Sequence, residues 1–214
     1  ACAQGWISPK AMRNGIIITV LFACLIGSSL LFYAGWELII VGLLCVLFAF
    51  LYTTGPYPLS YNGWGDILVI VFFGFVPVGG TYYVQALTWT TDTTIASLIC
   101  GLLIDTLLVV NNYRDREADA RSGKRTVIVR FGEKFGSYLY LMLGMTASLL
   151  CFWFLFEGHL YAALLPLLYL IPHFLTWKRM VRIHSGKKLN SILGETSRNM
   201  LLMGILLSIG FFLN

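Results

Sequence analysis

Seven long apolar stretches follow one another along the chain, and short polar segments separate them. About 20 predominantly apolar residues are enough to cross the hydrocarbon core of a bilayer. In lipid every backbone N–H and C=O group must be satisfied within its own segment, so each stretch is predicted to be a helix. The expected fold is an all-α, polytopic transmembrane helix bundle of about seven spans. The predicted spans are Gly15–Tyr33, Glu37–Thr53, Asp66–Ala86, Thr93–Asn111, Phe135–Phe156, Leu160–Trp177 and Ser197–Leu213.

The composition agrees with a membrane protein. Of the 214 residues, 58% are hydrophobic and only 12% are charged, and the mean hydropathy is +0.79. A soluble domain carries roughly 25% charged residues, so that class is excluded. Residues 1–214 are expected to form a single membrane-embedded domain. The five cysteines are scattered without a CxxC pair, which favours neither a disulfide framework nor a zinc site.

All 15 Lys and Arg residues fall on one side of the predicted bundle. They occupy segments 1–14, 114–134 and 178–198. The positive-inside rule makes this side cytoplasmic, and in a bacterium the expected location is the cytoplasmic (inner) membrane. The net charge of +5 then reflects topology and gives no support for nucleic-acid binding. The linkers on this side, 54–65, 112–134 and 178–196, are expected to be the longer ones.

The segment 111–125, NNYRDREADARSGKR, concentrates charge directly after an apolar span. Asn111, Asp115 and Asp119 are spaced i, i+4, i+8, so on a helix they share one face. Mg²⁺ prefers oxygen ligands and usually takes one or two carboxylates together with phosphate oxygens and waters. The neighbouring cations could hold and neutralise a departing diphosphate. These cations are Arg114, Arg116, Arg121, Lys124 and Arg125.

A plainer interpretation competes with metal chemistry. Alternating charges at a helix end usually form a solvated face, and the cations also satisfy the topology rule without catalysis. Spacing alone favours this interpretation. Asp105 lies within the span, where an ionisable residue is costly and indicates function. It is about 15 Å from Asp115 along a continuous helix, so we do not assign it to the same site.

The linker from Tyr52 to Asp66 reads YTTGPYPLSYNGWGD and is rich in Gly, Pro and Tyr. Its aromatic residues fit either an interfacial belt or the wall of a pocket for a flat aromatic substrate. Within the following span, Val78-Gly-Gly-Thr-Tyr82 comes directly after Pro77. This pattern predicts a kink or a close helix contact.

The run N-N-x-R-D-x-x-x-D-x-x-x-G-K-R-T in 111–126 resembles the second Asp-rich motif of the UbiA superfamily of membrane prenyltransferases. QGWISP, YTTGPYPLSYNGWGD and FFGFVPVGGTYYVQ also resemble that family, in the same order. The resemblance is strongest to the branch that prenylates 1,4-dihydroxy-2-naphthoate in menaquinone synthesis. It implies helices around a central cavity, with two Asp-rich motifs that hold Mg²⁺ against a polyprenyl diphosphate.

The resemblance implies roles for individual residues. Asn111, Asp115 and Asp119 would be the metal ligands, and the two aspartates would be the catalytic residues. The residues expected to bind the polyprenyl diphosphate or the small aromatic substrate are Asn112, Arg116, Lys124, Arg125, Tyr52 and Tyr57.

The chain departs from the family pattern in two respects. The first Asp-rich motif, Asn-Asp-x-x-Asp, is expected before QGWISP, yet no acidic residue precedes Glu37. Seven spans and two further helices would make the nine that the family implies, so we expect the chain to be an N-terminally shortened version. Relatives that act on 4-hydroxybenzoate place a Lys four residues after a Tyr, where this chain has Pro56 after Tyr52. This difference favours the naphthoate branch.

Other functions remain open from the sequence. Another aromatic acceptor would fit the same family, and an inactive membrane scaffold would fit a chain without the first motif. A transporter would need polar residues on several helices, whereas Asp105 and a few hydroxyls are the polar groups deep in these spans.

Overall fold

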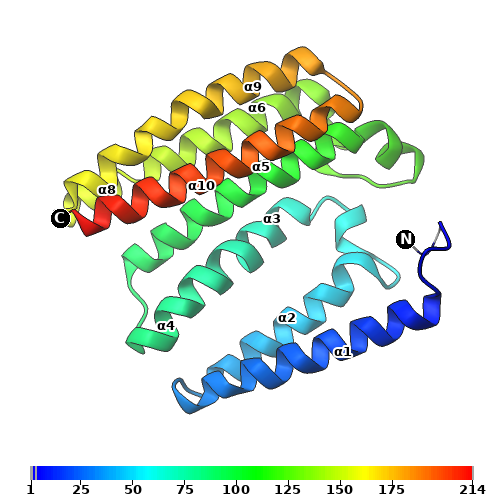
Figure 1. Ribbon diagram of the computed structural model, residues 1–214, viewed down its shortest axis with the longest axis horizontal. Helices are drawn as coiled ribbons and strands as arrows, with labels where there is room; N and C mark the ends of the chain where they lie inside the picture. Colours follow the sequence, from blue (N-terminus) through cyan, green and yellow to red (C-terminus); the bar gives the residue numbers. More distant parts are fainter. Residues whose placement is uncertain (1, 3, 214) are drawn as a thin grey trace.

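The computed structural model describes residue 2 and residues 4–213, and every regular element in that part of the chain is helical (Figure 1). The predicted all-α membrane bundle is confirmed. Six passes are long and apolar enough to cross a membrane, and a seventh, Glu37–Thr53, is apolar but shorter. The elements are α1 (Pro9–Ser28), η1 (Ser29–Phe32), α2 (Glu37–Thr53), η2 (Leu59–Tyr61), α3 (Gly65–Val69), η3 (Ile70–Gly79), α4 (Gly80–Ala86), α5 (Thr91–Arg121), α6 (Val127–Leu150), α7 (Trp153–Phe156), α8 (Leu160–Leu164), η4 (Leu165–Tyr169), α9 (Leu170–Ile183), η5 (Lys187–Leu189) and α10 (Asn190–Phe212).

The helix α5 is the centre of the bundle. Its residues Ile99, Val109, Val110 and Tyr113 are fully buried, and they pack in one core with residues of α6, α9 and α10. By contrast, no residue of α1 or α2 is buried. Figure 1 shows these two helices side by side at one edge, with α3 and α4 between them and α5. The apolar faces of α1 and α2 therefore suit contact with lipid.

The third pass approaches α5 without intervening side chains. A Cβ placed on Gly74 would lie 2.5 Å from the carbonyl oxygen of Ser97 and 2.8 Å from Cα of Gly101. Small residues allow such close backbone contact between membrane helices. The turns from Ile70 to Gly79 are wider than α-helical turns and contain Pro77, which has no N–H to donate. The expected close contact is present, but it is centred on Gly74, before the segment Val78–Tyr82.

Two of the three long linkers expected at one end, 112–134 and 178–196, are mostly helical, which corrects their boundaries. α5 has 31 residues, or about 46 Å of helix, and so exceeds a bilayer core of roughly 30 Å. A helix satisfies its own backbone groups in water as well as in lipid, so it can continue past the apolar zone. Only residues 122–126 connect α5 to α6, and residues 184–186 follow α9 before η5 begins.

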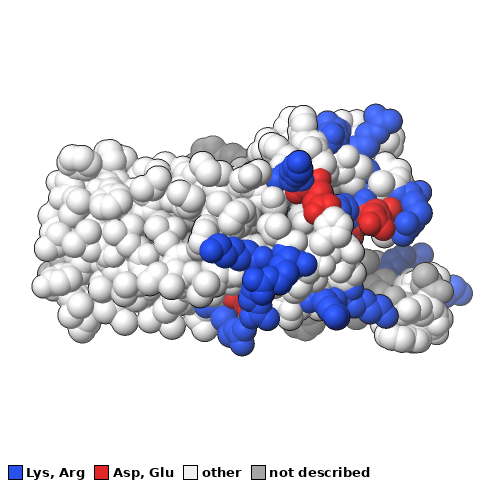
Figure 2. Space-filling view, turned by 90° about the horizontal axis from the view of Figure 1, so that it is seen from above, with Lys and Arg blue, Asp and Glu red and all other residues white. Residues whose placement is uncertain are grey.

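Charged residues gather at one end of the molecule. In the view of Figure 2, Lys, Arg, Asp and Glu occupy one part of the surface and the opposite end is free of them. The connectivity explains this distribution, because segments 54–64, 122–126 and 184–186 all lie at the same end (Figure 1). This end also carries the last turns of α5.

Candidate active site

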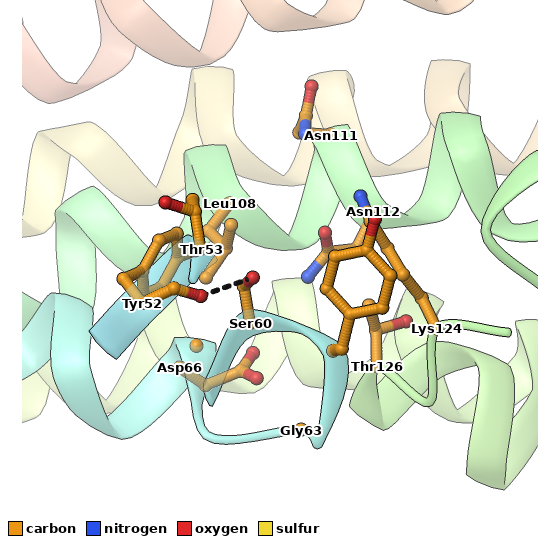
Figure 3. Close-up of a pocket in the computed structure, with 12 residues that line it drawn as sticks. Tyr52, Thr53, Ser60, Gly63, Asp66, Leu108, Asn111, Asn112, Lys124 and Thr126 are labelled. Atoms are coloured by element: carbon orange, nitrogen blue, oxygen red, sulfur yellow. Dashed lines mark hydrogen bonds between the residues drawn. The ribbon is translucent and has the colours of Figure 1, made fainter. Parts of the chain in front are cut away.

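A polar cavity of about 380 Å³ lies at the charged end, between the end of α2, the following loop, the start of α3 and the last turns of α5 (Figure 3). Four of the residues predicted from the sequence line it: Tyr52, Asn111, Asn112 and Lys124. The other lining residues are Thr53, Ser60, Tyr61, Gly63, Gly65, Asp66, Leu108 and Thr126.

The Gly- and Tyr-rich loop is fastened to the segment that follows α5. The backbone N–H of Arg125 donates to the carbonyl oxygen of Tyr61 at 2.7 Å. Arg130 Nη2 donates to the carbonyl oxygen of Asn62, also at 2.7 Å. The ammonium of Lys124 lies 5.3 Å from the centre of the Tyr61 ring, a cation–π distance. These contacts hold the loop as one wall of the cavity.

The aromatic residues of the loop divide between the two expected roles. Tyr52 and Tyr61 line the cavity, whereas Tyr57 is 56% exposed and does not. Ser60 Oγ donates to the backbone carbonyl of Tyr52 at 2.6 Å, which joins the loop to the end of α2 (Figure 3). The cavity therefore presents aromatic side chains from both the helix and the loop.

Arg114 brings together three polar side chains on one side of α5. Its guanidinium donates to both carboxylate oxygens of Asp115, at 2.7 and 2.6 Å, and to Asn111 Oδ1 at 2.7 Å. It also donates to Asn190 Oδ1, at the start of α10, at 3.0 Å. In Figure 3, Asn112 points toward the loop and Asn111 points to the other side of α5. The two asparagines thus face different groups.

Asp119 and Lys124 form the second ion pair of the segment. Lys124 Nζ lies 3.0 Å from Asp119 Oδ1, and the Lys124 backbone N–H donates to the carbonyl oxygen of Asp119 at 2.9 Å. Gly123 makes this tight turn possible, since its φ of 79° is accessible to glycine at little cost. The turn places the ammonium of Lys124 at the cavity while Asp119 stays buried.

Two of the predicted basic residues lie outside this cavity. Arg116 faces α6, where its Nη2 pairs with Glu133 Oε2 at 3.1 Å, and its Nη1 donates to the carbonyl oxygens of Tyr113 and His184. Arg125 contributes its backbone N–H to the loop contact, and its side chain is exposed. Arg116 therefore links the end of α5 to α6 and to His184, which follows α9.

The predicted metal ligands are oxygen donors, and Arg114 and Lys124 hold most of these oxygens in the structure. Asn111, Asp115 and Asp119 offer an amide and two carboxylates, all oxygen ligands of the kind that Mg²⁺ takes. Of the two carboxylate oxygens of Asp119, Oδ1 pairs with Lys124. No cluster of three or more His, Cys, Asp or Glu side chains converges on one point among the described residues. Of the three predicted ligands, Asn111 lines the polar cavity, whereas Asp115 and Asp119 do not.

Two further acidic residues lie near the cavity. Asp66, on α3, lines the cavity, and Asp105, on α5, is 1% exposed. Asp66 was not predicted as a site residue and Asp105 was set apart from the site. The signal for both is an ionisable residue within an apolar span, which by itself indicates a functional position.

A larger apolar cavity of about 850 Å³ adjoins the polar one. It lies between α2, the third pass, α5 and the first turns of α10. The two cavities share Tyr52, Leu108 and Asn111. The other lining residues are Cys45, Phe48, Ala49, Leu68, Val69, Phe72, Phe73, Ile104, Leu107, Leu193, Gly194 and Ser197. The polar cavity and the larger apolar cavity thus meet at one side of α5.

Comparison with known proteins gives consistent matches. A family profile described as the UbiA prenyltransferase family matches residues 1–210. The chain is 33% identical over 227 residues to 1,4-dihydroxy-2-naphthoate octaprenyltransferase of Escherichia coli (strain K12), covering 99% of this chain and 71% of the relative. The Mycobacterium tuberculosis protein of the same name is 37% identical over 145 residues, covering 68% of this chain and 50% of the relative.

A more distant relative carries a related name. The 2-carboxy-1,4-naphthoquinone phytyltransferase of Synechocystis sp. is 26% identical over 141 residues, which cover 63% of this chain and 46% of that protein. No solved structure matches the chain. The similarity to known proteins is therefore a similarity of sequence.

Proposed function

We propose that this chain, which belongs to the UbiA prenyltransferase family, transfers a polyprenyl group from its diphosphate to 1,4-dihydroxy-2-naphthoate in menaquinone biosynthesis. The carboxylate of the acceptor would leave as CO2. The single observation that carries the proposal is that a polar cavity and a larger apolar cavity share Tyr52, Leu108 and Asn111. Such a pair of chambers suits a substrate with a charged head and an apolar tail. The names of the relatives from E. coli and M. tuberculosis support the choice of acceptor.

The charged head of the polyprenyl diphosphate is proposed to lie at the last turns of α5. Lys124 and Asn112 line the polar cavity and can donate hydrogen bonds to diphosphate oxygens. Asn111, Asp115 and Asp119 would hold Mg²⁺, with the two aspartates as the catalytic residues. When bound, Mg²⁺ would supply positive charge that stabilises the departing diphosphate. Arg116 and Arg125 would contribute to the positive potential at this end of the bundle.

The polyprenyl tail is proposed to occupy the apolar cavity. Burying an apolar chain stabilises it by about 0.8 kcal/mol per CH2 group relative to water, and by much less relative to lipid. The cavity therefore orients the tail more than it strengthens binding. Its walls also keep water from the reacting carbon, where a carbocation-like centre would otherwise be captured.

The aromatic acceptor is proposed to lie against Tyr52, with Tyr61 from the loop opposite. Aromatic side chains pack favourably against a flat ring in offset or edge-to-face arrangements. Tyr57, which is exposed within this loop, would contact an acceptor that enters from the water side. Pro56 stands where relatives that act on 4-hydroxybenzoate are expected to have a lysine, and this supports the naphthoate acceptor.

The chain is a multi-pass membrane protein. We further propose that it resides in a bacterial cytoplasmic membrane with its charged end toward the cytoplasm. The gathering of Lys and Arg at one end supports this orientation, because cytoplasmic loops carry an excess of these residues. Both the aromatic acceptor and the diphosphate head would then reach the site from the cytoplasm.

The metal assignment is tested by replacing its ligands. Asp115→Ala and Asp119→Ala are made in the protein expressed from its complete gene, and prenyl transfer is measured in membranes with Mg²⁺. Each variant is expected to lose most activity. Glu117→Ala removes an exposed carboxylate from the same helix and is expected to retain it. Near-normal rates in both aspartate variants would show that the metal assignment is wrong.

A further inference from the structure

Two acids near the polar cavity, the half-buried Asp66 and the buried Asp105, have no role in the proposed function. Asp66 comes from α3 and lines the cavity, and Asp105 comes from α5. In each side chain the Oδ1 atom is buried and has no hydrogen-bond partner within the described residues. The two residues come from neighbouring helices, since α3 packs against α5.

The position of Asp105 follows from the helix period. Leu108 and Asn112 line the cavity, and Asp105 precedes them by three and seven residues on α5. Residues at these spacings share one helix face. Asp105 therefore lies about 4.5 Å below Leu108 along the helix, on the side of α5 that faces the cavity. The Tyr52 hydroxyl lies near both carboxyl groups and near the Lys124 ammonium.

The arrangement is costly if it serves only the fold. A buried polar group without a partner destabilises a protein, and a buried charge does so more strongly. In this pair no hydrogen bond or ion pair with a described residue offsets the cost at the two Oδ1 atoms. An ionisable residue kept in an apolar span under these conditions indicates function.

We propose that Asp66 is the proton acceptor for the ring hydroxyl of the aromatic acceptor and that Asp105 is a positioning residue behind it. This inference rests on the proposed function. Asp66 lines the same cavity as Tyr52 and Tyr61, so a ring held between these tyrosines lies within reach of its carboxylate.

The proposed step balances atoms and charge. The hydroxyl O–H bond breaks, its proton moves to Asp66, and the O–H electron pair forms a ring C=O bond. The displaced ring electrons form the new carbon–carbon bond to the prenyl group, and the prenyl C–O bond breaks as its electron pair leaves with the diphosphate. When the attacked carbon bears the carboxylate, loss of CO2 returns electrons to the ring oxygen. Asp66 then gives the proton back, so no further reactant is needed.

The test uses Asp66→Asn in the protein expressed from its complete gene, assayed in membranes with the naphthoate acceptor and a polyprenyl diphosphate. Removing a general base typically lowers the rate by 10²–10⁴-fold, so kcat at neutral pH is expected to fall on that order. The variant is expected to recover as pH rises, because the free naphthol then ionises in solution without a base. Asp66→Glu is expected to retain a measurable part of the activity, and Glu117→Gln to behave as wild type.

A second measurement uses the wild-type protein and does not depend on folding of a variant. Methylation of the acceptor hydroxyl beside the carboxylate removes the proton that Asp66 would take. The methylated acceptor is expected to inhibit competitively and not to be prenylated.

The possible failures are distinguishable. Transfer at equal rates and with equal pH profiles in wild type and Asp66→Asn, or prenylation of the methylated acceptor, would overturn the role of Asp66 alone. If wild type transferred nothing to the unmodified naphthoate, the proposed function would be overturned, and the role of Asp66 with it.

Discussion

Arg114 holds the carboxylate of its neighbour Asp115 through two hydrogen bonds, at 2.7 and 2.6 Å. Adjacent residues on a helix normally point in different directions, so this contact turns both side chains toward the same side of α5. The same guanidinium binds Asn111, which brings two of the three expected metal ligands onto one fixed group. Arg114 therefore fixes the positions of the Asn111 and Asp115 side chains relative to each other.

The first prediction concerns this fixed geometry. A lysine cannot replace the planar fork of an arginine at a bidentate site. In Arg114→Lys the Mg²⁺ concentration for half-maximal prenyl transfer is expected to rise by about tenfold, the equivalent of roughly 1.4 kcal/mol. A Mg²⁺ titration of activity in membranes measures it. Arg121→Lys, an exposed change on the same helix, serves as the control. An unchanged titration curve for Arg114→Lys would count against the ordering role.

The second prediction concerns Lys124. Its ammonium lies at the polar cavity and is the group proposed to bind diphosphate oxygens. A hydrogen bond to a charged group contributes about 1.5–3 kcal/mol, so Lys124→Gln is expected to raise the KM for the polyprenyl diphosphate by tenfold or more. The KM for the naphthoate should change little. Lys187→Gln, at an exposed position of η5, is the matched control. A rise confined to the acceptor KM would contradict the assignment.

The third prediction concerns the contact between the third pass and α5. A Cβ at Gly74 would meet the Ser97 backbone at 2.5 Å, so Gly74→Ala forces the helices apart. Overpacking of this kind typically destabilises by about 1–3 kcal/mol. The thermal unfolding midpoint in detergent is expected to fall for Gly74→Ala. The midpoint should be unchanged for Gly80→Ala, because a Cβ added at Gly80 meets nothing within 4 Å. Equal midpoints would mean that the two helices tolerate separation.

The fourth prediction concerns the apolar cavity. Ala49 lines it, and Ala49→Phe adds bulk where the polyprenyl tail is proposed to lie. Transfer from octaprenyl diphosphate is expected to fall more than transfer from geranyl diphosphate, because the shorter tail needs less of the cavity. Ala23→Phe, on the exposed helix α1, should affect neither. An equal loss with both substrates would indicate that the tail lies elsewhere.

The spans could be predicted because membrane helices follow from length and apolarity alone. Glu37–Thr53 and the other windows match helices with shifts at their ends. The shifts are largest at the charged end, where Asn112–Arg121 continues α5 beyond the apolar zone. Hydropathy marks where lipid ends, whereas a helix ends where its backbone is capped or turned, as at Gly123.

The site was predictable only in part, for a similar reason. The shared helix face of Asn111, Asp115 and Asp119 follows from their spacing. Other features of the site depend on rotamers and on contacts between distant segments. They are the hydrogen bonds from Arg114 to Asp115, the turn that brings Lys124 next to Asp119, and the position of Asp66 near Asp105. Sequence pattern could mark Asp105 as costly, but it could not show that Asp66 on another helix shares its environment.

The central claim is that the protein prenylates a naphthoate, and direct product analysis tests it most plainly. Membranes containing the protein expressed from its complete gene are incubated with Mg²⁺, octaprenyl diphosphate and 1,4-dihydroxy-2-naphthoate labelled in its carboxyl group. The account predicts a prenylated naphthoquinol and one labelled CO2 released for each prenyl group transferred. It is contradicted if no prenylated naphthoquinol forms, or if 4-hydroxybenzoate is prenylated in its place.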